Sequence, residues 1–276
     1  MIEHWPHGRD KTVATLAEFC RAVEAIRKSE VGAGNPADLL FRGQARFDWH
    51  LLPKLGRQQT KGHPSNIENL MFKEFKRTSF PFVQRELSDW EYLALAQHHG
   101  LPTRLLDWSY SALAALWFAV SGGPCGDADG VVWVLAARTQ DFAEPSARSS
   151  PLGNDGRTRV YRPMQVSPRI VAQAGVFTAH KLKDGAFVPL ERNSYFKHKL
   201  TRLRISAAKF PTVKKQLEVS GVNAAVLLPD LSGLCEYLTE RYVHPGTRPG
   251  AGREIPGRDP LLYISVGGNP SSGPRR

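Results

Sequence analysis

The chain has 276 residues, of which 41% are hydrophobic and 23% are charged, fractions that are typical of a globular protein. No apolar run reaches the roughly 20 residues that a membrane-spanning helix needs, and the N-terminus has no apolar signal-peptide core. We therefore expect a cytoplasmic protein with no membrane association. The three cysteines, Cys20, Cys125 and Cys235, lie too far apart to indicate a disulfide framework or a metal site.

The charge balance favours an acidic partner. The 37 Lys and Arg residues outnumber the 26 Asp and Glu residues, which gives a net charge of +11. A field of this sign favours association with nucleic acid, nucleotides or an acidic protein. No run of Lys or Arg exceeds two residues, so an even basic surface that serves solubility alone is the alternative.

The N-terminal third contains two predicted helices and a strand. Residues 12–28 have the periodicity of an amphipathic helix. Residues 39–43 are typical of a buried strand that ends in a glycine, and residues 45–64 are irregular. A helix is predicted from about Ser65 to Arg85, because Ser65 and Glu68 have the spacing of a capping box.

The central stretch, residues 90–120, has two apolar helical patterns joined by a polar segment. The first helix is predicted to end near His99, with Gly100 as a left-handed C-cap and Pro102 preventing its continuation. The second helix is predicted to begin after Ser109 or Ser111 as its N-cap. We expect residues 101–110 to form a fixed connection between two buried helices, so their polar groups serve either a buried network or a site.

The remaining elements complete an α+β fold. Further strands are predicted at residues 130–136, 168–173, 202–206 and 261–266, and further helices at 209–219 and toward the end of 223–242. Residues 139–160 are expected to be a loop, and residues 244–260 a Pro/Gly-rich arm. Helices and strands do not alternate regularly, so the prediction is a single α+β domain with a mixed or antiparallel sheet flanked by helices.

Several motifs of the chain together resemble the FRG-domain family, a bacterial family named after its Phe/Tyr-Arg-Gly motif. They are FRGQ at 41–44, Trp49, Leu51 and Pro53, Glu74-Phe75, AQHHGLPTRLLDWS at 96–109, ALWFAV at 115–120 and PRIVAQAGVF at 168–177. The resemblance spans about residues 38–240. It divides the chain into an N-terminal helix and linker (1–36), an FRG domain (37–243) and a C-terminal arm (244–276). A role as a toxin or anti-phage effector is what membership of this family implies.

The first candidate site residues are Arg42, Gly43 and Gln44. An arginine at the end of a strand can present its planar guanidinium to a phosphate or carboxylate, and a glycine beside it lets a ligand approach the backbone. The amide of Gln44 can donate and accept hydrogen bonds. The alternative is that Arg42 pairs with a buried acid, such as Glu74, Glu91 or Asp107, and joins the sheet to the helices.

The central motif supplies a second group of candidates: Thr103, Arg104, Asp107, Trp108 and Ser109. Arginine suits a phosphate, aspartate suits ribose hydroxyls, and tryptophan offers a face for a base. These residue types together favour nucleotide binding. The alternative is a local Arg104–Asp107 salt bridge with Trp108 in the core.

Two further sets of polar residues are weaker candidates. Side chains at His98 and His99 diverge by about 100° on a helix, so the pair cannot chelate one ion, and His99 is assigned as an acid–base group. Arg169 and Gln173 alternate onto one face of the strand predicted at 168–173. The alternative for Gln173 is a hydrogen-bonded residue in a strand that pairs with residues 39–43.

The order of these pieces is similar to that of ADP-ribosyltransferases. In that superfamily a strand with Arg or His followed by Gly holds NAD, a Ser/Thr-bearing segment leads into a helix, and a later strand supplies an acidic residue. The resemblance implies NAD as the ligand, with Arg42-Gly43 in the first place and Gln173 in the last. A glutamine cannot ionise to stabilise an oxocarbenium-like transition state, and Glu191 is another candidate for that carboxylate.

We therefore predict a site for a nucleotide or NAD. The residues assigned to catalysis are Arg42, His99, Asp107 and Gln173, and those assigned to ligand binding are Gly43, Gln44, Thr103, Arg104, Trp108, Ser109 and Arg169. The alternative function is a basic nucleic-acid-binding or nuclease module without NAD chemistry, in which Trp49 or Trp108 stacks on bases. A third is a basic surface that docks an acidic protein.

Overall fold

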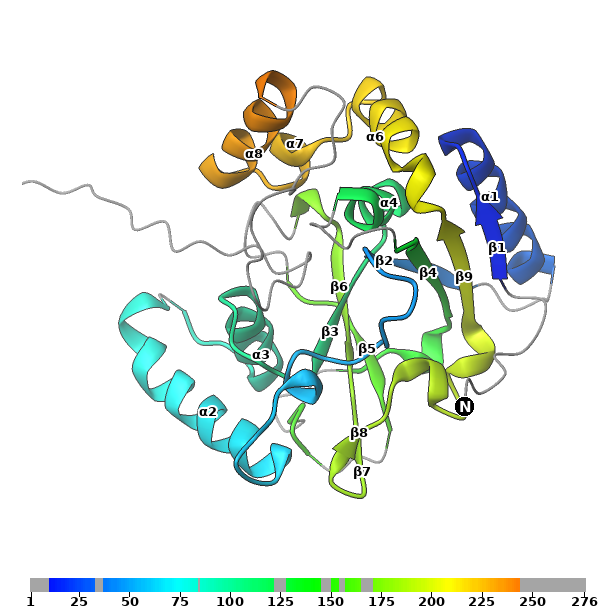
Figure 1. Cartoon of the computed structure of the whole chain (residues 1–276). Helices are drawn as coiled ribbons and strands as arrows, with labels where there is room; N and C mark the ends of the chain where they lie inside the picture. Colours follow the sequence, from blue (N-terminus) through cyan, green and yellow to red (C-terminus); the bar gives the residue numbers. More distant parts are fainter. Residues whose placement is uncertain are drawn as a thin grey trace, which may run out of the picture.

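The structure is a computed structural model that describes residues 10–32, 37–83, 85–121, 128–144, 150–153, 157–164 and 171–243. Within these ranges a curved sheet has helices packed against it (Figure 1). The predicted C-terminal arm with its strand at 261–266, and the residues Cys125 and Arg169, lie outside the described residues. None of the described helices has the length and apolar character needed to cross a membrane.

The main sheet has seven strands in the order β1-β9-β4-β2-β3-β6-β5. β1 and β9 are parallel, and every other neighbouring pair is antiparallel. The fold is therefore α+β with a mixed sheet, as predicted. The strands are β1 (Asp10–Val13), β2 (Asp38–Gln44), β3 (Leu105–Ser109), β4 (Gly130–Ala137), β5 (Arg159–Tyr161), β6 (Gly175–Ala179) and β9 (Leu200–Ile205). A separate hairpin pairs β7 (Leu182–Lys183) with β8 (Ala186–Phe187).

The α-helices of the described ranges are α1 (Leu16–Gly32), α2 (Pro64–Ser79), α3 (Asp89–His98), α4 (Ala112–Ser121), α6 (Phe210–Val219), α7 (Ala224–Leu227) and α8 (Leu231–Tyr242). Short 3-10 turns connect them: η1 (Leu55–Arg57), η2 (Phe80–Phe82), η3 (Thr139–Asp141), η4 (Leu190–Arg192), η5 (Lys197–Lys199) and η6 (Ala207–Lys209). Because β1 belongs to the main sheet and α1 to its core, the folded unit begins before residue 37.

The two faces of the sheet carry separate hydrophobic clusters, because successive side chains of a strand point to opposite faces. On one face, α4 is buried along most of its length between the strands and helices α1, α6 and α7. α3 packs on this face over β3 and β6. On the other face, Trp108 and Trp133 pack with Leu51, Leu190 and Phe196 from irregular segments. In the described ranges, loops and short 3-10 turns therefore cover the second face.

The prediction for residues 101–110 was wrong, because residues 105–109 form strand β3 near the middle of the sheet. β3 pairs with β6 along all its residues, from Leu105 opposite Ala179 to Ser109 opposite Gly175. Leu106 and Trp108 are buried on one face and Leu105 on the other. A short apolar run buried on both faces has no periodicity that distinguishes a strand from a connection between helices.

Several predicted helix boundaries are corrected. α1 begins only at Leu16, after β1, and Thr15 caps it by accepting the Glu18 amide. The capping box predicted at Ser65 and Glu68 is wrong, since α2 starts at Pro64 with His63 as its N-cap. Gly100, with a φ of 88°, confirms the left-handed C-cap. Ser111 is the N-cap of α4, because its hydroxyl accepts the Ala114 amide.

The strand predicted at residues 168–173 is also wrong where the structure describes it. Gln173 lies in a turn, followed by Ala174 with a φ of 46°, and the strand begins only at Gly175. Because the chain changes direction at Ala174, Gln173 lies outside β6. Its side chain therefore does not have the neighbours that a residue of the strand would have.

Candidate functional site

Arg42 and Asp107 connect the FRGQ stretch to the central motif. β2 and β3 share a single register pair, Phe41 with Ser109. Next to that pair, Nη1 of Arg42 donates to the backbone carbonyl of Asp107 at 2.9 Å and lies 3.8 Å from its carboxylate Oδ2. The guanidinium thus joins the two strands beyond the point where their backbone pairing ends. Of the alternatives for Arg42, the pairing with Asp107 is the one observed.

Gln97 extends this network from α3, although it is not among the site residues predicted from the sequence. Its Nε2 donates to Asp107 Oδ2 at 3.1 Å, and its Oε1 accepts the hydroxyl of Thr103 at 2.7 Å. The Thr103 oxygen in turn accepts the Leu105 amide, so its proton points at Gln97 and fixes which end of the amide faces Asp107. The sequence did indicate that Gln97 is buried, because it lies seven residues after Trp90 on the same face of the predicted helix.

The surroundings of Gly43 and Gln44 are filled by other parts of the protein. A Cβ at Gly43 would lie 1.9 Å from the carbonyl oxygen of Ala115, so α4 occupies the space that the prediction gave to a ligand. Gln44 is buried, and its Oε1 accepts the indole N–H of Trp133 at 2.8 Å. Both residues therefore support packing between the sheet and its covering layers.

Arg104 pairs with Glu68 and not with Asp107, so the alternative of a local Arg104–Asp107 salt bridge is wrong. Nη2 of Arg104 lies 2.8 Å from Glu68 Oε2, and the Arg104 amide donates to the other carboxylate oxygen at 2.8 Å. Both side chains are buried, with 6% and 2% exposed. The pair anchors α2 to the start of β3, which explains why Glu68 does not cap the helix.

Trp108 and Ser109 are buried in further hydrogen-bonded chains. The Trp108 indole donates to the hydroxyl of Thr178, which lies 3.0 Å from Nε2 of His180. Complete burial lowers the pKa of His180 to about 3, so its imidazole is neutral at pH 7. Ser109 Oγ donates to the Gln173 carbonyl and accepts the Ser111 amide. The Trp108 ring, at 2% exposure, therefore has no face available to a base.

The other candidates lie apart from this network. Gln173 donates its amide to the carbonyl of Leu227 at 3.1 Å, which ties the turn before β6 to α7. His99 is exposed at the end of α3. Glu191 accepts the Leu51 amide and lies 2.6 Å from Nδ1 of His50, on the loops of the opposite sheet face. The structure thus brings together Arg42, Thr103 and Asp107 among the predicted residues, with Gln97 added.

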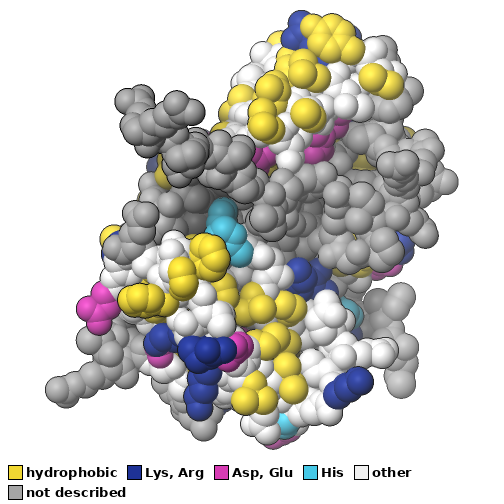
Figure 2. Space-filling model, turned by 90° about the vertical axis from the view of Figure 1, so that its left-hand side faces the viewer, with side chains coloured by type: hydrophobic (Ala, Val, Ile, Leu, Met, Phe, Trp, Pro, Cys, Tyr) yellow, Lys and Arg dark blue, Asp and Glu magenta, His cyan; other side chains and the backbone are white. Residues whose placement is uncertain are grey.

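A pocket of ≈370 Å³ lies beside α3, and none of the predicted site residues lines it. Its walls are mainly apolar, with the ion pair between Arg85 and Glu91 among them. Figure 2 views the side of the molecule that carries α2, α3 and α8, where hydrophobic side chains gather in separate groups. In the described ranges no three His, Cys, Asp or Glu side chains come together as ligands for a metal ion.

A comparison with protein families finds a match for the part of the chain that carries this network. Residues 37–125 match the family model of the FRG domain. The match includes β2, α2, α3, β3 and α4, and therefore every member of the Arg42–Asp107–Gln97–Thr103 network. No curated protein and no solved structure shows significant similarity to the chain.

Proposed function

Residues 37–125 are an FRG domain, and from this premise we propose that the protein binds a ribose-containing nucleotide, with NAD as the first candidate, at the carboxylate of Asp107. One observation carries the proposal: the network described above holds a carboxylate that still reaches the surface. The Asp107 side chain is 15% exposed, whereas the Arg42 side chain that accompanies it is 2% exposed.

The neighbours of Asp107 hold its carboxylate in place as a hydrogen-bond acceptor. Arg42 and Gln97 place positive charge and an N–H donor beside the carboxylate, which stabilises its negative charge. An ionised carboxylate accepts hydrogen bonds only, so it suits the paired hydroxyls of a ribose. Because the carboxylate is already held in place before the ligand binds, less side-chain entropy is lost on binding.

The same carboxylate suits cleavage of the bond between ribose and nicotinamide. In that reaction water adds to the ribose carbon, nicotinamide leaves with the electron pair of the C–N bond, and ADP-ribose and a proton are released. Positive charge develops on the ribose, and an adjacent carboxylate stabilises it. Asp107 takes the role that the sequence assigned to Gln173, whose amide bonds Leu227. NAD depletion is how such an enzyme would act as a toxin or anti-phage effector.

The test uses the purified full chain with NAD, with nicotinamide release followed by chromatography and mass spectrometry. Asp107→Asn keeps the shape of the side chain and removes its charge, and we expect a loss of turnover of about 100-fold or more. Asp48→Asn is the matched control, since Asp48 also pairs with an arginine but is exposed on the surface. The control should retain wild-type turnover.

Calorimetric titration with NAD, ADP-ribose and AMP separates binding from cleavage. Saturable binding that Asp107→Asn weakens, without nicotinamide release, would support the nucleotide site and exclude the enzyme. Unchanged NAD together with no saturable binding of any of the three ligands would overturn the proposal.

A further inference from the structure

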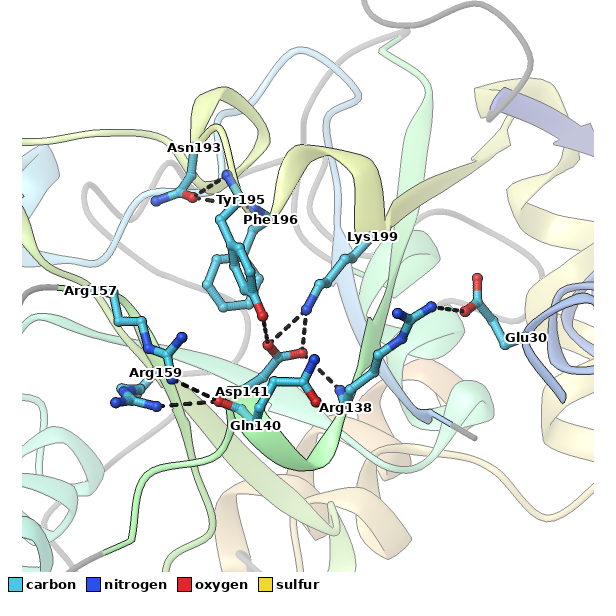
Figure 3. Close-up of polar contacts among 10 residues, drawn as sticks. All are labelled: Glu30, Arg138, Gln140, Asp141, Arg157, Arg159, Asn193, Tyr195, Phe196 and Lys199. Carbon is cyan, nitrogen blue, oxygen red and sulfur yellow. Dashed lines mark hydrogen bonds and ion pairs between the residues drawn. The ribbon is translucent and has the colours of Figure 1, made fainter. Parts of the chain in front are cut away.

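Arg157 and Arg159 lie side by side and share one acceptor. Nη2 of Arg157 and Nη1 of Arg159 donate to the backbone carbonyl of Gln140, at 3.1 and 3.2 Å (Figure 3). The carbonyl carries no net charge, and within the described ranges neither arginine has a carboxylate partner. Two guanidinium groups are thus held together at one neutral acceptor, and no described carboxylate offsets the repulsion between them.

Such a pair is suited to a phosphate. Each guanidinium has five N–H donors, of which one is given to Gln140 in the contacts above. The remaining donors match the geometry of phosphate oxygens. An anion that contacts both groups would remove the repulsion between them. The side chain of Arg157 is exposed, so a ligand can reach the pair from solvent.

The carboxylate of Asp141, the residue after Gln140, is buried and already engaged by other partners. Asp141 accepts the hydroxyl of Tyr195 at 2.7 Å, the amide of Arg138 at 2.8 Å, and Nζ of Lys199 at 2.7 Å with each oxygen. Its side chain is fully buried. Asp141 therefore uses its charge on Lys199 and fixes the conformation of η3, which presents the Gln140 carbonyl to the arginines.

Tyr195 adds an aromatic surface to the same cluster. Its hydroxyl is held by Asp141, the residue after Gln140, and 41% of the residue is exposed. Nζ of Lys199 lies over the ring, 4.0 Å from its centroid. In Figure 3 the Tyr195 hydroxyl reaches Asp141 from above, and the two arginines reach Gln140 from the left. Aromatic rings beside cationic groups are the usual elements of single-strand recognition, in which bases stack while cations contact the backbone.

We propose that this surface binds single-stranded nucleic acid, with Arg157 and Arg159 contacting phosphodiester oxygens and Tyr195 stacking on a base. The net charge of +11 supports a polyanionic partner. This surface shares no residue with the network around Asp107, so each proposal can fail without the other. Trp108, which the sequence suggested for stacking, is buried, and Tyr195 takes that role.

The experiment measures fluorescence anisotropy of a labelled 20-nucleotide DNA strand with the full chain at several KCl concentrations. Arg157→Gln/Arg159→Gln should raise Kd about tenfold and reduce the slope of log K against log salt by about 1.4, because each phosphate contact contributes about 0.7. Arg21→Gln/Lys215→Gln is the matched control, since it removes two exposed charges from α1 and α6. Its Kd should stay within about twofold of wild type.

Tyr195 provides a second, uncharged test. Tyr195→Ala should raise Kd by about tenfold without changing the salt slope, whereas Tyr195→Phe keeps the ring and the affinity. Thermal melting of each variant verifies folding, and the single change Arg157→Gln at an exposed position replaces the double variant if that one unfolds. Asp107→Asn should leave strand binding unchanged.

Three outcomes would overturn the proposal. The first is that the wild type does not bind the strand. The second is that both double variants weaken binding equally, which would indicate a diffuse basic surface. The third is that millimolar inorganic phosphate displaces the strand at constant ionic strength, which would assign the arginine pair to a free phosphate.

Discussion

Arg42 donates a hydrogen bond to the backbone carbonyl of Asp107 while its guanidinium also faces the carboxylate of the same residue. The arginine of the FRGQ stretch therefore has a structural task, holding β2 against β3 from inside the protein. It also stabilises the charge of the Asp107 carboxylate, which reaches the surface.

Replacement of Arg42 should destabilise the protein strongly. Arg42→Ala removes the buried guanidinium that donates to the Asp107 carbonyl and faces its carboxylate, and we expect the free energy of unfolding to fall by about 3 kcal/mol. Urea denaturation measures this change. Arg46→Ala, which removes an exposed arginine paired with Asp48, should cost less than about 1 kcal/mol. Equal losses of unfolding free energy in the two variants would contradict a larger contribution of the buried Arg42–Asp107 pair to stability.

Gly43 should tolerate no side chain. Gly43→Ala places a Cβ 1.9 Å from the Ala115 carbonyl oxygen, so α4 must move away from the sheet. We expect a loss of about 3 kcal/mol in the free energy of unfolding. Gly62→Ala is the control, because its Cβ would meet nothing closer than Ile67 Cδ1 at 3.8 Å. A melting temperature of Gly43→Ala that equals the control would show that the contact relaxes freely.

Glu68 should be required for folding although it lies outside the candidate site. Glu68→Gln leaves the buried guanidinium of Arg104 without a counter-charge, and we expect a loss of about 3 kcal/mol. Denaturation of Glu74→Gln gives the comparison, since Glu74 pairs with Arg77 in solvent, and its midpoint should match that of the wild type. The idea fails if Glu68→Gln is as stable as Glu74→Gln.

His180 should make stability fall below neutral pH. Burial lowers its pKa to about 3 in the folded protein, against 6.5 in an exposed imidazole. Between these two values the unfolded chain binds a proton that the folded chain does not, so stability rises with pH across that window. The slope from this residue approaches about 1.4 kcal/mol per pH unit below pH 6.

The comparison of wild type with His180→Gln isolates that slope. Unfolding free energies measured from pH 5 to 7 should depend on pH less steeply in the variant, whatever its absolute stability. An unchanged slope would mean that the folded imidazole titrates near its ordinary pKa.

The local patterns identified those elements that follow from one helix or one strand alone. The strand of residues 130–136, the C-cap at Gly100 and the N-cap at Ser111 were predictable, because periodicity, glycine conformation and capping chemistry act over a few residues. The strand at 105–109 was missed because its burial on both faces depends on β6, α3 and the loop at Leu51, which are distant in sequence. The same holds for Glu68, which follows capping-box spacing but bonds a residue 36 positions away.

For the candidate site, the sequence by itself determined which residue types were present. It supplied the FRGQ stretch, the central motif that carries Asp107, and the family to which residues 37–125 belong. Only the tertiary structure decided their tasks. It paired Arg42 with Asp107, placed α4 over Gly43, gave Arg104 to Glu68, and left the Asp107 carboxylate within reach of solvent. The physical reason is that a buried polar group must find its partner in space, and that partner can come from any part of the chain.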